Sequence, residues 1–396
     1  MSDDYIQGIG LSLLSSFLTT ALALGLLSIP LRRLPEGTHW SMAAKEFAPV
    51  RTAQTFILVW SVLFMWIFSS EPRDFESPPE TWQLFLVSCS IVAGCLVGSR
   101  VALLGGEIPK TARNWKSCML LIKWVLFPAV PATLLLMLLT WRQGLDWRAL
   151  VIAAAMLALL LPLCTGTSVV LLKWLRILKP APGNIQQAGR RLAEREGAPL
   201  KSVLTMKLGI VNAFASVWTG DLILTSSALS VLNEEEINCV MAHEIGHLNE
   251  SRLMRWRRLI ILPGLISMGL MPAAASSGQT MAVFGFVAVY IVLRSLAHHH
   301  HNRMEVQADA AAVRSQISEG VYARALEKIH AAGLIPADFA AGHPYPSLHD
   351  RMISAGVRPD FPRLVPASHR RGVFAALAAS AAFLVLWRFL ILVAGG

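Results

Sequence analysis

The chain has 396 residues, of which 54% are apolar and only 15% are charged, and its mean hydropathy is +0.53. Because a typical soluble chain is about one quarter charged, this composition excludes an ordinary water-soluble protein, and its apolar content excludes a disordered one. The formal net charge of +10 comes from basic residues between apolar stretches, without basic runs interleaved with aromatic residues. It therefore indicates membrane topology rather than nucleic-acid binding.

Apolar stretches of about 20 residues, the length that crosses a bilayer as a helix, occur throughout the chain. The predicted spans are Gly10–Ile29, Thr52–Ser70, Trp82–Gly98, Cys118–Trp141, Leu150–Leu172 and Val373–Val393, with a hairpin of two shorter limbs, Leu259–Met271 and Met281–Leu293. Lys and Arg alternate between poor and rich loops in step with these spans. We therefore predict eight spans, with both termini outside and the two polar regions in the cytoplasm. The acidic leader, Asp3 and Asp4, argues against a cleavable signal peptide.

The first polar region shows three local patterns. Residues Ile185–Glu196 have the spacing of an amphipathic helix. Two stretches rich in β-branched and aromatic residues, Ser202–Ala215 and Trp218–Thr225, flank a turn signal at Thr219–Asp221 and predict a small β-hairpin. Asn233 followed by Glu236 predicts a capping box that opens a helix over Glu234–Asn249.

That helix contains an HExxH motif, His243-Glu244-Ile245-Gly246-His247. Residues four apart lie on one helical face, so both imidazoles can converge on a single zinc ion. Glu244 then points near the open metal position and can take a proton from bound water. Gly246 allows a neighbouring segment to approach closely.

A catalytic zinc site takes a third protein ligand, and the acidic candidate is Glu305 in a stretch of helical spacing. Asp309 shares its face, one turn later. While Glu305 ligates the metal, Asp309 can accept the free N–H of a ligating histidine and hold its orientation. The alternative is that both are merely solvated helix charges, which the HExxH upstream disfavours.

With these motifs, the chain resembles the integral-membrane zinc metallopeptidases typified by the type I CAAX prenyl protease and HtpX. The resemblance runs from about residue 185 to residue 355 and rests on ordered motifs: Asn212–Ala215, Ile223–Leu229, the HExxH, Arg303–Asp309 and His343–Arg351. It implies one zinc ion held by His243, His247 and Glu305, with Glu244 as general base. It also implies that Asn212 and the histidine of the last motif lie near the scissile carbonyl.

The last motif departs from the family. The family histidine usually precedes its arginine by six residues, whereas His343 precedes Arg351 by eight and Tyr345 occupies the position six before it. Either side chain can donate a hydrogen bond to a developing oxyanion, so both stay open, with His343 preferred.

The segment Val211, Asn212, Ala213, Phe214 and Ala215 is expected at the edge of the predicted hairpin. An extended substrate backbone could pair with it by strand addition.

Together these features predict a mainly α-helical membrane bundle with a cytoplasmic zincin-like region containing the hairpin. The expected divisions are a five-span bundle, two catalytic segments separated by an apolar hairpin, and a last span, at 1–172, 173–258, 259–297, 298–372 and 373–396.

The predicted function is metalloendopeptidase action on membrane-associated proteins or peptides. The partners would be such substrates and the lipid bilayer, with no nucleic acid. The excess of arginine over lysine suggests a bacterial inner membrane. The alternative is a zinc-binding membrane sensor or signalling protein without proteolysis. A transporter would place acidic residues within its spans, and the predicted spans hold almost none.

Overall fold

The computed structural model describes residues 3–69, 81–102, 146–338 and 346–394, with gaps at 261, 265, 268–269, 271–273, 275–277 and 367. The chain forms two compact units. The first comprises Met1–Arg113, Leu334–Asp338 and Arg363–Gly396, and the second comprises Asn114–Gly333 and Phe339–Pro362.

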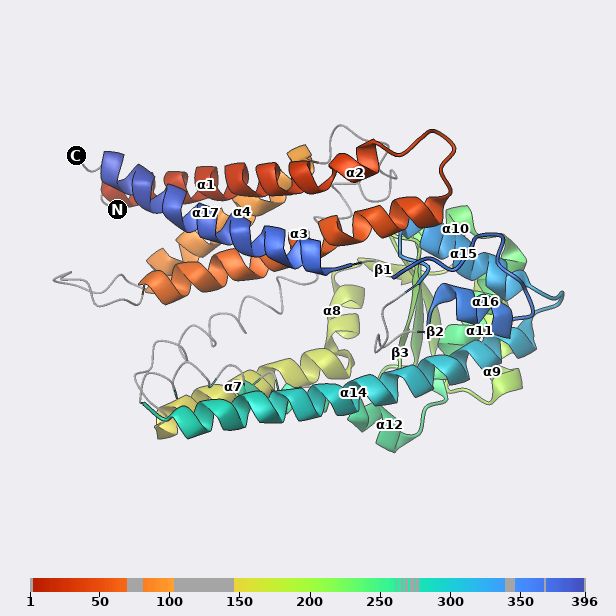
Figure 1. Ribbon diagram of the computed structural model, residues 1–396. Coiled ribbons are helices and arrows are strands. Elements are labelled where there is room, and N and C mark those ends of the chain that lie inside the picture. Colours follow the sequence, from red (N-terminus) through yellow and green to blue (C-terminus); the bar gives the residue numbers. More distant parts are fainter. Residues whose placement is uncertain are drawn as a thin grey trace. The chain divides into compact units, whose positions relative to one another are not determined.

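The first unit is a helical bundle. Its helices are α1 (Asp3–Leu27), α2 (Ile29–Arg32), α3 (Trp40–Ser69), α4 (Thr81–Ala102) and α17 (Arg370–Ala394). Helix α1 packs against α4 and α17, and α17 packs against α3 (Figure 1). Leu24, Phe47, Ile91 and Phe383 belong to one buried apolar cluster in this unit. The bundle therefore buries residues from all four long helices in one core.

Small residues bring α1 and α4 together. A Cβ atom added at Gly94 would lie 2.0 Å from Ser16 Oγ, and one added at Gly98 would lie 2.6 Å from the Phe17 carbonyl oxygen. This small-xxx-small spacing is the common device for close helix packing in membranes, where apolar side chains gain little by leaving lipid. The Ser16 hydroxyl, which faces Gly94, donates to the Leu13 carbonyl oxygen at 3.0 Å. Its hydrogen is therefore bonded within α1.

The second unit contains a four-stranded sheet surrounded by helices. Its elements are α7 (Trp147–Pro162), the π-helical turn η1 (Leu163–Thr167), α8 (Ser168–Trp174), β1 (Leu178–Pro180), α9 (Gly183–Glu196), β2 (Ser202–Met206), β3 (Ala213–Ser216), β4 (Asp221–Thr225), α10 (Ser226–Val231), α11 (Glu234–Leu248), α12 (Arg252–Arg257), α14 (Thr280–Ser315), α15 (Val321–Gly333) and α16 (Leu348–Ser354).

The strand order is β1-β2-β4-β3, in which β2 and β4 are parallel and the two outer pairs are antiparallel. Strand β4 is buried throughout because both faces of the sheet are covered. Leu222 and Leu224 pack in a cluster with Met241 of α11, whereas Ile223 packs in a cluster with Leu172 of α8. This alternation follows from the two-residue period of a strand.

The prediction of a hairpin is confirmed for β3 and β4, whose antiparallel register pairs Ser216 with Asp221. It was wrong to extend the first arm back to Ser202. Residues Ser202–Met206 form a separate strand that pairs in parallel with β4, and β1 was not predicted. The parallel pair needs a crossover, which the alternating pattern alone does not reveal. The predicted helix over Ile185–Glu196 is confirmed as α9.

Four helices in the described ranges are long and apolar enough to cross a membrane: Gln7–Leu27, Trp147–Trp174, Thr280–Ala297 and Arg370–Leu390. The chain is thus an integral membrane protein by the length and composition of these helices. The number eight stays a prediction, because Cys118–Trp141 and part of the first hairpin limb lie outside the described residues.

The span Trp147–Trp174 is interrupted at η1, where Gly166 has φ +103°. A Cβ atom at Gly166 would lie 2.6 Å from Thr219 Cγ2 in the β3–β4 turn. Beyond the interruption, Lys173 Nζ donates to Asp221 Oδ2 at 2.7 Å, and the Asp221 side chain is fully buried. Although burial raises the pKa of Asp221, the hydrogen bonds from Lys173 and Ser202 bring it below its usual value. The end of this span is therefore joined to the start of β4.

Candidate metal centre

The HExxH motif lies on α11, whose start is fixed by the predicted capping box. The Asn233 side chain accepts from the Glu236 backbone N–H at 2.8 Å, and the Glu236 carboxylate accepts from the Asn233 N–H at 2.9 Å. Such a cap is worth about 1 kcal/mol. The helix ends at Leu248, one residue before the predicted end. The motif therefore sits in the last turns of a helix with a defined start.

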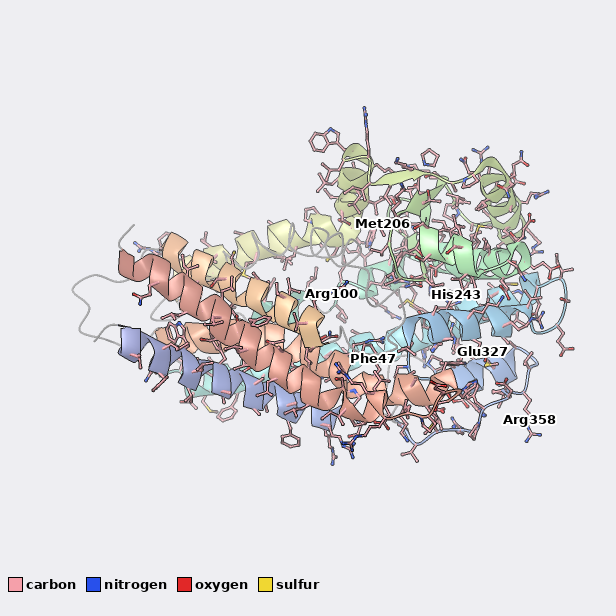
Figure 2. All side chains as sticks on the ribbon, turned by 90° about the horizontal axis from the view of Figure 1, so that it is seen from above. Phe47, Arg100, Met206, His243, Glu327 and Arg358 are labelled. Atoms are coloured by element: carbon pink, nitrogen blue, oxygen red, sulfur yellow. The ribbon has the colours of Figure 1, made fainter. Side chains whose placement is uncertain are left out.

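Three side chains meet on the face between α11 and α14. His243 Nε2 lies 3.6 Å from Glu305 Oε2, and His247 Nε2 lies 3.6 Å from Glu305 Oε1. One ligand atom from each residue lies within 4.8 Å of the other two, and all three residues are buried. Figure 2 labels His243 on α11, which packs along α14. These three residues could hold a metal ion.

Glu305 lies on a helix, α14, that is longer than the sequence pattern predicts. The sequence pattern separates an apolar limb ending at Leu293 from a polar segment beginning at His298, yet α14 runs unbroken from Thr280 to Ser315 (Figure 1). A candidate span and the third ligand therefore share one rigid helix. A Cβ atom at Gly246 would lie 3.0 Å from Ala308 Cα, which shows the close approach expected at this glycine.

The other ring nitrogen of His243 faces a network from three elements. His243 Nδ1 lies 3.0 Å from Asp309 Oδ1 and 2.9 Å from the Tyr322 hydroxyl. Arg351 binds the Asp309 carboxylate with both Nε (2.8 Å) and Nη2 (2.6 Å), and Tyr322 donates to Asp309 Oδ1 at 2.5 Å. Burial raises the pKa of Asp309, but the hydrogen bonds and charges of His243 and Arg351 hold it well below its usual value. Asp309 is therefore an ionised acceptor that orients the imidazole.

The buried Tyr322 hydroxyl stays protonated in this network. Burial and the adjacent Asp309 charge raise its pKa well above the usual value of 10.0, despite the opposing Arg351 charge.

His247 has a matching support of its own. Its Nδ1 lies 3.0 Å from Glu250 Oε1, and Arg258 binds both oxygens of that carboxylate, with Nε 2.8 Å from Oε2. Burial lowers the pKa of His247, but the Glu250 hydrogen bond and nearby carboxylates give a net rise. Neither Glu250 nor Arg258 was predicted from the sequence. The three-residue separation of Glu250 from His247 was the available signal.

Glu244 lies half-buried between the two ligand histidines in the motif. Within the described part of the chain its carboxylate makes no hydrogen bond or ion pair, and it is not among the converging ligands. This leaves it available to a water molecule at the centre.

Strand β3 is an edge of the sheet and packs against α11. At its start, the Asn212 side-chain oxygen accepts from the Ala213 N–H at 2.9 Å, and the Asn212 N–H donates to Thr225 Oγ1 at 3.1 Å. Ala213 and Val211 are buried, whereas Phe214 and Ala215 are partly exposed. His343 and Tyr345 lie outside the described residues, so the choice between them stays open.

Comparison with known proteins agrees with this geometry. Residues 181–355 match peptidase family M48. A protease HtpX homolog of Aeropyrum pernix is 28% identical over 194 residues, which cover 42% of this chain and 61% of that protein. One of Pyrobaculum aerophilum is 31% identical over 171 residues, which cover 38% and 48%. The chain thus spans less than two thirds of the length of these curated relatives.

The crystal structure of S. mikatae Ste24p superposes with a TM-score of 0.51 at 14% identity, covering 90% of this chain and 100% of that one. At this identity the likeness concerns the fold. The part of the chain that carries His243, His247 and Glu305, residues 181–355, is therefore similar to peptidase family M48. This agrees with the family of membrane metallopeptidases that its motifs resemble.

Proposed function

We propose that the chain is a membrane-embedded zinc metalloendopeptidase that hydrolyses peptide bonds of membrane-associated proteins or peptides. One observation carries this proposal: two imidazoles and one carboxylate converge, and each imidazole is held from behind by a carboxylate that is itself bound by an arginine. Metal-binding histidines characteristically have such partners, which fix the tautomer and raise the basicity of the ligand.

The donor set and spacing fit zinc. Bonds of about 2.0–2.1 Å to a tetrahedral zinc ion place neighbouring ligand atoms about 3.4 Å apart. The two nitrogen-to-oxygen separations of 3.6 Å are close to this value. Two histidines and one glutamate are also a known catalytic set, which leaves one position open. A zinc ion there would supply Lewis acidity for the peptide carbonyl and make water acidic near neutral pH.

The chain supplies the proton transfers and the orientation. Glu244 accepts a proton from the attacking water on its carboxylate and returns it to the leaving amine nitrogen. The Asn212 amide and the side chain of His343 or Tyr345 would donate to the oxyanion. Extended substrate would pair with β3 along Val211–Ala215, an assignment that its edge position in the sheet supports.

The setting follows from the membrane helices. The candidate span Thr280–Ala297 continues directly into the helix that carries Glu305, so the centre lies near a membrane face. We assign that face to the cytoplasm, and the membrane to a bacterial inner membrane, from the distribution of basic residues and the arginine content.

The test compares wild type with Glu244→Gln for zinc content and for cleavage of a membrane-protein substrate. We expect both to hold one zinc per chain, while the variant loses at least about 100-fold in rate, as removal of a general base does. Equal cleavage by both would contradict the role of Glu244. Wild type that holds zinc but cleaves nothing would favour the sensor function.

The third ligand needs a separate test. Because Glu305 supplies the only carboxylate of the ligand set, Glu305→Ala is expected to release the zinc, measured by metal analysis after dialysis. Unchanged zinc content would show that another residue completes the site.

A further inference from the structure

A polar pocket lies beside the metal centre. Its volume is about 520 Å³, and its lining comes from α9, the end of α11, α12 and the polar half of α14. It is lined by Gly246 of the HExxH motif and by Glu250, but by none of the three converging ligands. Three arginines reach it from two elements: Arg257 on α12, and Arg303 and Arg314 on α14.

The carboxylates in this lining are already paired. Glu250 is bound by His247 and Arg258, and Glu196 lies 3.3 Å from Arg314 Nη2. The two remaining guanidiniums have no carboxylate partner among the residues that the structure describes. Arg257 contacts only the Met254 sulfur, at 3.7 Å, and neither it nor Arg303 has a carboxylate partner in the described part of the chain. Two unpaired guanidiniums on one pocket make an anion site, and their planar N–H groups suit phosphate oxygens.

The pocket also lies at the depth of lipid headgroups. Arg303 comes six residues after the candidate span that ends at Ala297, which is about 9 Å along a helix. The headgroup layer extends about 5–8 Å beyond the hydrocarbon core on each side, so a long arginine side chain at this position reaches it. On α12, Leu253 and Trp256 are 60% and 57% exposed, as expected of residues that meet a bilayer interface.

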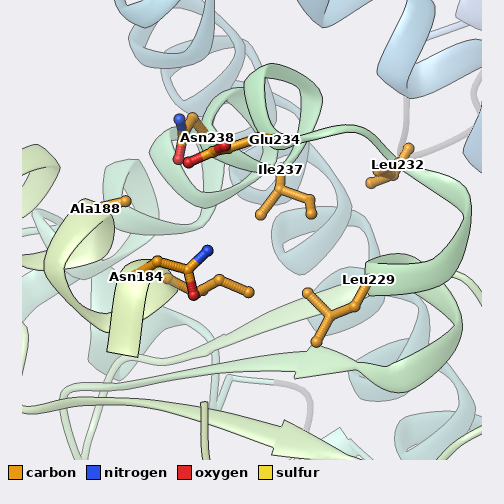
Figure 3. A pocket seen from close by; sticks show the side chains of 8 residues that line it. Asn184, Ala188, Leu229, Leu232, Glu234, Ile237 and Asn238 are labelled. Atoms are coloured by element: carbon orange, nitrogen blue, oxygen red, sulfur yellow. The ribbon is translucent and has the colours of Figure 1, made fainter. Parts of the chain in front are cut away.

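Another pocket of the same unit provides a contrast. It has about 270 Å³ and lies between α9, α10 and the start of α11 (Figure 3). Its lining is apolar except for Asn184, Asn238 and the Glu234 carboxylate, and it contains no basic residue. It therefore has no feature that would hold an anion.

We propose that the pocket of Arg257 and Arg303 binds the phosphate of an anionic phospholipid headgroup beside the metal centre. The proposal does not depend on peptidase activity, because it rests on residues outside the ligand set. The bound headgroup would fill the pocket at the junction of α11, α12 and α14. The lipid would then brace the two helices that carry the metal ligands.

The test uses the full chain, purified in detergent and stripped of lipid, with binding followed by native mass spectrometry. The probes are short-chain phosphatidylglycerol, short-chain phosphatidylcholine and inorganic phosphate. The variants are Arg257→Gln, Arg303→Gln and the double variant. The control is Arg190→Gln/Arg191→Gln, which removes the same charge from exposed positions on α9 outside the pocket.

We expect wild type to bind phosphatidylglycerol more tightly than either other probe. Each pocket substitution should weaken that binding about fivefold, the effect of one basic residue near an anionic surface, and the double variant about 25-fold. The control should bind as wild type does. Zinc content of each variant, measured alongside, shows that the second unit remains folded.

Two results would overturn the proposal. One is unchanged phosphatidylglycerol binding in the double variant, or an equal loss in the control. The other is wild type binding inorganic phosphate as tightly as the lipid, which would make the pocket a site for free anions. If the double variant lost its zinc, phosphatidylglycerol binding by the two single variants would be compared with that of the control instead. Unchanged binding in both single variants would then overturn the proposal.

Discussion

The two histidines of the metal centre are supported in the same chemical way but by different parts of the fold. His247 is held by Glu250 and Arg258, all within twelve residues that run from the end of α11 to the C-cap of α12. His243 is held by Asp309, Tyr322 and Arg351, which come from α14, α15 and α16. One support is thus local, whereas the other exists only when three further helices are in place.

This difference separates two properties of the centre. The arginine behind His243 is also the more buried of the two, since the Arg351 side chain is 11% exposed whereas that of Arg258 is 29% exposed. Loss of the Asp309 carboxylate would leave the Arg351 charge where water reaches it poorly. The His243 support should therefore affect both metal binding and folding, and the His247 support mainly metal binding.

The largest effect is expected from Asp309→Asn. Because Arg351 would be left buried without its counter-charge, unfolding free energy should fall by about 3–5 kcal/mol, and zinc affinity by about 10–100-fold. Chemical denaturation and competition with a chelator measure these two quantities. A variant that loses affinity but keeps wild-type stability would contradict the coupling of this support to the fold.

Gly246→Val should come next. The added side chain collides with Ala308 and Ala311 of α14, and overpacking of this kind costs about 1–3 kcal/mol. The collision moves the histidines away from Glu305 but leaves the His247 support within its own segment. Zinc affinity should fall, and Gly246→Ala, which gains about 1 kcal/mol of helix propensity, is the milder control. Equal zinc affinity in all three proteins would show that α11 and α14 need not be so close.

Glu250→Gln breaks the local support. Zinc affinity should again fall by about 10–100-fold, but stability by only about 1–2 kcal/mol, because the freed Arg258 can turn to water. The same two measurements apply, side by side with Asp309→Asn. A stability loss as large as that of Asp309→Asn would remove the distinction between the two supports.

The smallest effect is a difference in acid sensitivity of the metal-free protein. The pKa values of Glu250 and Asp309 are both lowered in the fold, from ordinary values of 4.5 and 3.8, because their histidine and arginine partners outweigh burial. Each ionised carboxylate therefore stabilises the fold fully at pH values above its ordinary pKa. This stabilisation is lost as the pH falls from the ordinary pKa through the lowered pKa of the folded state.

On acidification, the stability advantage of wild type over Glu250→Gln should begin to shrink below about pH 4.5, and that over Asp309→Asn only below about pH 3.8. Denaturation midpoints from pH 7 to pH 3 measure this. If both stability advantages began to shrink at the same pH, the two carboxylates would titrate together, contrary to this prediction.

The sequence predicts the elements whose geometry is local. The capping box of Asn233 and Glu236 and the helix after it depend only on residues a few positions apart. Likewise, a four-residue spacing places two imidazoles on one helical face whatever surrounds the helix. The spans in α1, α7–α8, α14 and α17 followed from length and hydropathy alone.

Other features were beyond the sequence for definite reasons. A change from apolar to polar residues at His298 suggests a boundary, but helix hydrogen bonds do not depend on side-chain polarity, and α14 continues through it. The parallel pairing of β2 with β4 depends on a crossover rather than on the residues of either strand. Tyr322, in a mainly apolar amphipathic helix, has no pattern that marks it as a partner of His243.

By itself, then, the sequence determined which side chains could bind a metal and which segments could cross a membrane, since both depend on short-range spacing and composition. Only the tertiary structure decided which histidine Asp309 supports, and only it brought Tyr322 and Arg351 to that pair. Tyr322 is 79 residues from His243, and Arg351 is 42 residues from Asp309. Contacts over such separations form only when the core between them is packed. The same packing excludes water, and this makes an unpaired charge there costly.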